Sequence, residues 1–189
     1  MMHDKFIDHE ELHGLLRGTV EENDIGVTFA PNLLLNGEVN DDLILIFKVD
    51  SYYNSTQMNN PPKSVDYFVV VRCEHNHGYD AYIIELRNVG DTSGVKPREI
   101  RKKFETVFQD FFVKFSNEFD EILSNLNSLK LYLITDPLGL KGKGLNDSDI
   151  AARIKDTVIE AFGFLAPFEF LGKPYLIEVK IPDPVIPAC

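Results

Sequence analysis

Residues 63–89 constrain the fold of this chain more than any other stretch, because they read as a β-hairpin with an acidic side chain on each strand. Residues 67–73 and 79–86 are runs of β-branched and aromatic residues, separated by a polar segment that ends in glycine. Asp66 precedes the first run, and Glu85 lies near the end of the second. Antiparallel pairing would therefore bring the two carboxylates to the same end of the hairpin.

A cation accompanies this acid pair. Arg87 follows two residues after Glu85, and side chains alternate faces along a strand, so these two side chains project to the same side. An acid pair beside a cation is a candidate functional site. The simpler alternative is that Asp66 and Glu85 are solvated strand ends and that Glu85 and Arg87 form a surface ion pair of little consequence.

The pattern of an aspartate, a strand, a turn, a second strand and Glu-x-Lys resembles the PD-(D/E)XK nuclease superfamily. V-D-Y-F-V-V-V at 65–71 and A-Y-I-I-E-L-R at 81–87 carry the resemblance, with Val65 in place of proline and Arg87 in the lysine position. The resemblance implies that Asp66 and Glu85 hold magnesium, with manganese as a substitute, and that DNA phosphodiester bonds are hydrolysed through metal-bound water. Because arginine stays charged and cannot act as a base, Arg87 would orient the water or the phosphate.

The rest of the chain alternates between helical and strand patterns. We expect one α/β (α+β) domain over residues 1–189, with a helix at 4–17, an interrupted strand at 25–35, a strand at 41–49, a loop at 52–63, a long helix at 97–126, a strand at 129–135, a helix at 146–162 and a strand at 174–181. This order is similar to the α-β-β-β-α-β core of the same superfamily, a restriction-endonuclease-like mixed sheet flanked by helices, with a helix and a strand added at the C-terminus.

Basic residues gather at the start of the predicted long helix, which Pro97 opens. Cations are unfavourable there because the helix dipole is positive at its N-terminus, which suggests that the cluster has a use. Since the helix follows the Glu85 strand closely, its start would lie near the acid pair and could contact DNA phosphates. Neutralisation by Glu99 and by the acidic N-terminal part of the chain is the alternative. The residues concerned are Lys96, Arg98, Arg101, Lys102 and Lys103.

The net charge of −11 argues against unspecific attraction to nucleic acid. Residues 1–50 alone hold 11 acidic and 3 basic side chains. An alternative function is therefore a catalytically inactive interaction protein on the same fold, of the inhibitor or immunity type, that binds a basic protein partner. The acidic face would consist of Glu10, Glu11, Glu21, Glu22, Asp41 and Asp42.

Two further motifs compete with the hairpin. H-E-E-L-H at 9–13 matches the zinc-peptidase pattern, in which His9 and His13 would bind zinc, but only eight residues precede His9 and no later histidine is available outside the hairpin turn. Glu10 or Glu11 could instead be a helix-borne acid near the metal. A second Glu-x-Lys, formed by Glu178 and Lys180, has no aspartate strand before it and reads as a surface feature.

The chain also carries signals of its compartment. It has no apolar run of the roughly 20 residues that a membrane helix needs, and its first residues lack a secretory signal. Cys73 and Cys189 do not make a disulfide framework, so we expect a reducing cytoplasm. The sequence does not predict the oligomeric state.

Overall fold

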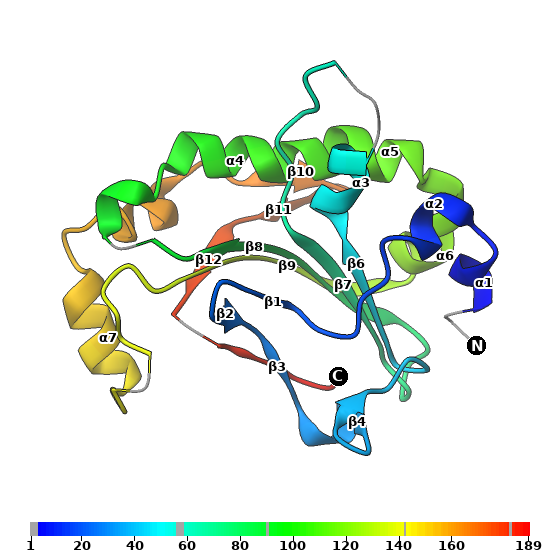
Figure 1. The fold of residues 1–189 in the computed structure, drawn as a ribbon, viewed down its shortest axis with the longest axis horizontal. Coiled ribbons are helices and arrows are strands. Elements are labelled where there is room, and N and C mark those ends of the chain that lie inside the picture. Colours follow the sequence, from blue (N-terminus) through cyan, green and yellow to red (C-terminus); the bar gives the residue numbers. More distant parts are fainter. Residues whose placement is uncertain (1–3, 56–58, 90, 142, 182) are drawn as a thin grey trace.

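A computed structural model describes residues 4–55, 59–89, 91–141, 143–181 and 183–189, and its centre is a five-stranded mixed sheet (Figure 1). The spatial order is β12-β9-β8-β7-β6. The neighbours β6, β7 and β8 are antiparallel, whereas β8, β9 and β12 are parallel. The protein is thus of the predicted mixed α+β class. The bounds are β6 (Ile44–Lys48), β7 (Tyr67–Arg72), β8 (Tyr79–Arg87), β9 (Leu126–Thr135) and β12 (Ile177–Lys180).

Helices cover one face of the sheet, with the longest helical segment lying across it (Figure 1). Phe104, Phe111 and Phe119 recur along that segment and are fully buried, so its apolar side is core, as the spacing predicts. No helix in the described part of the chain is long and apolar enough to cross a membrane. The helices are α1 (Asp4–Ile7), α2 (Glu10–His13), α3 (Val49–Ser55), α4 (Pro97–Thr106), a π-helical turn (Val107–Phe111), α5 (Phe112–Lys114), α6 (Ser116–Ser124) and α7 (Asp147–Ile154).

Short strands cover the opposite face and enclose a second, smaller core around Val20, Ile25 and Ile186. The last of these strands, β13, returns from the C-terminus to pair in parallel with β3. The short strands of this face are β1 (Glu21–Glu22), β2 (Ile25–Gly26), β3 (Thr28–Phe29), β4 (Leu34–Leu35), β5 (Glu38–Val39) and β13 (Val185–Ile186). The hairpin of β10 (Phe168–Phe170) and β11 (Lys173–Tyr175) packs instead with the core on the helical side. The 3-10 turns are Pro31–Leu33, Thr92–Gly94 and Glu160–Phe164.

Strand alternation decides which side chains face the helices. Along β7 and β8, Phe68 and Ile83 contribute to the core under the helices, whereas Val69 and Ile84 contribute to the core on the other face. Because the period of a strand is two, Asp66 and Glu85 fall on the helical side together with Phe68 and Ile83. The sheet therefore presents both carboxylates to α4.

Several predicted elements differ from the structure. The helix expected at 4–17 is two single turns, because the chain after Gly14 joins the sheet through a bridge between Leu16 and Phe47. The loop expected at 52–63 begins as α3, since Tyr52 and Tyr53 are buried in the core; residues 56–58 lie outside the described part. The last residue of the predicted long helix, Leu126, belongs to β9.

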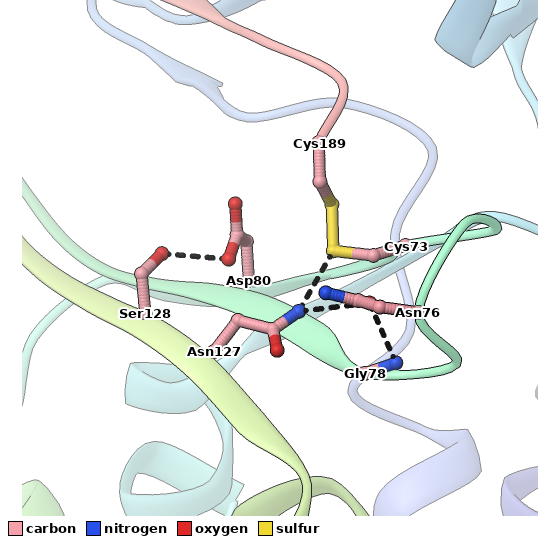
Figure 2. Close-up of a disulfide and its surroundings, with 7 residues drawn as sticks. All are labelled: Cys73, Asn76, Gly78, Asp80, Asn127, Ser128 and Cys189. Carbon is pink, nitrogen blue, oxygen red and sulfur yellow. Dashed lines mark hydrogen bonds between the residues drawn. A yellow bond between two sulfur atoms is a disulfide. The ribbon is translucent and has the colours of Figure 1, made fainter.

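The two cysteines are bonded to each other, contrary to the expectation that they make no disulfide framework. The Cys73–Cys189 disulfide links the end of β7 to the last residue of the chain over a sequence separation of 116 (Figure 2). Asn127 from β9 donates a hydrogen bond to the Cys73 sulfur at 3.3 Å and another to Asn76 at 3.2 Å (Figure 2). No local sequence pattern predicts this pairing, because the two positions meet only when β13 folds back over the sheet.

Candidate metal centre

The predicted acid pair meets at one end of the β7–β8 hairpin. Tyr67 pairs with Ile84, so one further step along the same register sets Asp66 opposite Glu85. The Asp66 side chain is fixed because its Oδ2 accepts a hydrogen bond from the Leu86 amide at 2.7 Å. Asp66 is only 7% exposed and Glu85 is fully buried. Solvated strand ends, the simpler reading of the sequence, do not describe these side chains.

Lys103 is the cation that contacts the pair. Its Nζ lies 2.6 Å from Oε1 of Glu85, and it comes from α4 on the helical face. Ile100 and Phe104 on the same helix are buried against the sheet, and Lys103 lies three residues after Ile100, so its side chain leaves the helix on the side of the sheet. Arg87 is exposed and lies in the same cavity as Glu85, as their alternation predicts.

Burial and mutual repulsion shift both carboxyl groups in the same direction. Burial raises the pKa of Asp66 to about 6, against the lowering effect of Lys103 and of the Leu86 amide. Burial and the neighbouring Asp66 raise the pKa of Glu85 to about 8, against the lowering effect of Lys103. Two buried acids with raised pKa values are a candidate site for a proton or another cation.

One oxygen of the acid pair has no hydrogen-bond partner in the described part of the chain. Oε2 of Glu85 is buried and makes no hydrogen bond among the described residues, although the side chain as a whole is only 1% exposed. Leaving a buried carboxylate oxygen without a partner costs roughly 1–3 kcal/mol. Such an oxygen is free to accept a bond, and the raised pKa of Glu85 favours a proton there in the absence of a metal ion.

Two further carboxylates join Asp66. One oxygen each from Glu22, Asp50 and Asp66 lie within 4.8 Å of one another, a spacing that suits a shared metal ion. Glu22 comes from β1 on the face of the short strands, and Asp50 comes from α3. Burial raises the pKa of Asp50, while Lys48 lowers it. Sequence reasoning did not identify Asp50, and it identified Glu22 only as part of the acidic interaction face and not as a neighbour of Asp66.

Lys48 belongs to this second group. Its Nζ lies 2.9 Å from Glu22 and 3.6 Å from Asp50, so the protein already places an ammonium group between two of the three acids. Burial alone would lower the pKa of Lys48, but the hydrogen bond that Lys48 donates to Glu22 and the charge of Asp50 raise it overall. Asp66 therefore lies between two sets of ion-paired acids. On one side Glu85 is paired with Lys103, and on the other Glu22 and Asp50 are paired with Lys48.

A cavity of about 380 Å³ opens onto this arrangement. Asp50, Asp66 and Glu85 line it, and its lining also includes Tyr53, whose hydroxyl donates to Asp110 at 2.6 Å. The mouth carries Arg87, Lys63, Lys96 and Glu99. Glu99 pairs with Lys63 at 3.3 Å and with Lys96 at 3.8 Å. The cavity thus has an acidic interior and a cationic rim that one glutamate partly neutralises.

The five basic residues predicted to contact DNA do not all line the cavity. Lys96 and Lys103 line the cavity, whereas Arg98 and Lys102 are exposed outside it. Arg101 has another role: it pairs with Glu105 at 3.0 Å, donates to the Ala166 carbonyl and lies over the Phe168 ring at 4.3 Å. Arg101 therefore fastens the segment around β10 to α4.

The competing motifs do not form sites with the acid pair. His9 caps α2, with its Nδ1 accepting from the Leu12 amide, and its Nε2 lies 3.5 Å from Glu118. The metal-suited clusters found among the described residues include neither His9 nor His13. Glu11 pairs with Lys114 at 3.0 Å, and neither Glu10 nor Glu11 lines the cavity.

The second Glu-x-Lys motif and the predicted acidic interaction face can also be located in the structure. Glu178 and Lys180 pair with each other at 2.8 Å on the edge strand β12, as expected for a surface feature. The six acids of the alternative interaction face divide between two layers. Glu10 and Glu11 lie on α2 with the helical core, whereas Glu21 and Glu22 lie on β1 across the sheet.

Comparison with protein-family models, with curated proteins and with solved structures found no match.

Proposed function

We propose that this protein is a metal-dependent nuclease-like phosphodiesterase, with Asp66 and Glu85 as ligands of a magnesium ion. The observation that carries the proposal is the buried Glu85 Oε2 without a partner, beside Asp66 in an acid-lined cavity. Carboxylate oxygens are the ligands that magnesium and manganese prefer. Asp50 and Glu22 would complete the set on the far side of Asp66.

When bound, such an ion lowers the pKa of an attacking water and offsets charge on a phosphate. The residues of the chain would orient the two carboxylates and bind the phosphate. Leu86 holds Asp66 in one orientation through its amide, and the strand register keeps Glu85 opposite. Arg87 and Lys96 at the mouth can donate hydrogen bonds to phosphate oxygens.

Lys103 supports the proposal further, because it supplies a lysine where Arg87 occupies the motif position. Its Nζ contacts Glu85 directly, whereas Arg87 makes no ion pair among the described residues. We assign to Lys103 the role of orienting the water or the phosphate, and to Arg87 a role in binding the phosphate.

The order α2, β6, β7, β8, α4 to α6 and β9, with β8 and β9 parallel, supports a restriction-endonuclease-like fold for the same proposal. DNA is the proposed substrate. A cytoplasmic location also stays a proposal, and the Cys73–Cys189 disulfide weighs against it, because disulfides persist mainly in oxidising compartments.

The test combines binding and cleavage. Calorimetry with manganese should show binding to the wild type and none to Asp66→Asn, which keeps an acceptor for the Leu86 amide. The matched control is Glu178→Gln, which changes the acid of the surface Glu-x-Lys. Plasmid cleavage in manganese should follow the same order. Equal metal binding by wild type and Asp66→Asn would remove the site, and binding without cleavage of any DNA form would remove the nuclease assignment.

A further inference from the structure

A second hollow lies on the face of the short strands, away from the acid pair. It has a volume of about 590 Å³ and is lined by residues from β1, β3 and the β4–β5 hairpin. Val20 is buried at its base, and Val27, Phe29 and Val39 are partly buried beside it. The floor of this hollow, the β3 groove, is therefore apolar.

The backbone of β3 has an unused side within the groove. Thr28 and Ala30 donate to Pro184 and Ile186 of the C-terminal segment, so their peptide groups face β13. Peptide groups alternate along a strand, so Val27 and Phe29 face the other way. Val27 donates to the Val20 carbonyl at 3.0 Å. One step further, the Phe29 amide makes no such bond, and among the described residues β13 is the strand that pairs with β3, on the opposite side. An extended segment could pair with Phe29.

The charged side chains that line the β3 groove are acidic. Glu21, Glu38 and Asp41 line it and are exposed, and no residue of its lining is basic. The nearby Arg17 is turned away, with its guanidinium donating to the carbonyls of Gly14 and Leu16. Lys141, which is close enough to Glu21 to be influenced by its charge, is paired with Asp183 at 2.9 Å.

We propose that the β3 groove binds an extended, basic segment of a protein partner by strand addition beside Phe29. Backbone hydrogen bonds to β3 would supply affinity, and alternate side chains would point either to the apolar floor or to the acidic rim. Lysine or arginine at every second position therefore matches Glu38 and Asp41, and small apolar residues between them match Val20 and Val39. This inference does not rest on the proposed nuclease activity.

The test measures fluorescence anisotropy of a labelled octapeptide of alternating lysine and valine on the full-length protein. We expect saturable binding that the charge-inverting pair Glu38→Lys with Asp41→Lys weakens at least tenfold. Thr19→Trp, which fills the groove from an exposed position, should weaken it similarly. The matched control is Glu74→Lys with Glu169→Lys, which changes the net charge equally at exposed sites outside the groove and should alter affinity less than twofold.

Two results would overturn the proposal. Equal weakening by the control pair would mean that the peptide responds only to the net charge of the protein. Equal binding of a peptide whose backbone amides are methylated would mean that no strand forms beside Phe29. Circular dichroism of each variant confirms that the fold persists, and Thr19→Trp supplies a readout that does not depend on charge.

Discussion

The ammonium nitrogen of Lys103 lies 2.6 Å from Oε1 of Glu85, which joins the long helical segment directly to the central strand of the sheet. Glu85 is fully buried, so this contact is the principal compensation for its charge within the protein. A ligand at Oε2 of Glu85 would therefore either share the carboxylate with the Lys103 ammonium group or displace it.

Replacing Lys103 by methionine should separate binding from catalysis. Loss of the ammonium group frees Glu85 for metal, so manganese affinity in calorimetry should stay the same or rise. Cleavage should fall by about 10²–10³-fold, the range for loss of one group that stabilises charge in the transition state. Lys102→Met, at the exposed neighbouring position, is the control and should leave both unchanged. A Lys103→Met protein that cleaves at the wild-type rate would contradict the assigned role.

The stability of the metal-free protein should fall as the pH rises from about 4.5 to about 8. The folded-state pKa values of Asp66 and Glu85 are raised, so over this interval the native state holds more protons than the unfolded state. Each group contributes at most about 1.4 kcal/mol per pH unit to the fall. Urea unfolding across this range measures it, and Glu85→Gln should flatten the curve. A stability that rises through this interval would show that the acids are not buried as a pair.

Metal binding should have the opposite dependence on pH. A metal ion displaces protons from the carboxyl groups that it binds, so manganese affinity should increase between pH 6 and pH 8 by up to about tenfold per pH unit for each proton released. Calorimetry in buffers of different ionisation enthalpy measures the number of protons directly. Proton release below one half at pH 7 would mean that Glu85 is not a ligand.

Asp50→Asn should weaken manganese binding by about 10–100-fold while leaving the fold intact. Asp50 shares a cluster with Asp66 and is a ligand candidate that lies only two residues after Lys48. The expected size is that for loss of a supporting group at a metal site. Asp120→Asn, an exposed position on α6, controls for the change of one charge. Equal affinities of the two variants would confine the metal to the Asp66–Glu85 pair.

Removing the disulfide should destabilise the protein without altering the metal centre. Cys73 and Asp66 lie at opposite ends of β7, so Cys73→Ser with Cys189→Ser should change manganese affinity less than twofold. The free energy of unfolding should fall by about 2–5 kcal/mol, as for other native disulfides. Urea unfolding with and without a reducing agent measures this. Identical curves for oxidised and reduced wild-type protein would show that the bond does not form in solution.

The hairpin illustrates what the sequence could predict. Alternation and the turn residues placed Asp66 and Glu85 at one end, and the structure pairs Tyr67 with Ile84 as that prediction requires. The buried state of the acids was not predictable, because it depends on α4 packing over them. Lys103 was identified only as one of five basic residues, since helical spacing does not state which of them will face the sheet.

The closeness of Glu22 to Asp66 could not be predicted from the sequence. It comes from a two-residue strand with no periodic pattern, and its distance to Asp66 is set by how β1 packs across the sheet. The disulfide has the same origin, since the pairing of β13 with β3 is a contact between residues more than 150 positions apart. Local sequence patterns do not predict contacts between residues so far apart in the chain.

The position of Glu22 also has a consequence for how the molecule can be divided. A fragment cut to the central strands and long helix, residues 44–135, would retain Asp66, Glu85 and Lys103 but would lose Glu22 and the layer that carries it. The smallest piece able to reproduce the whole donor set is therefore larger than the smallest piece with the right strand order. Engineering of this site into another scaffold would have to transplant two layers together.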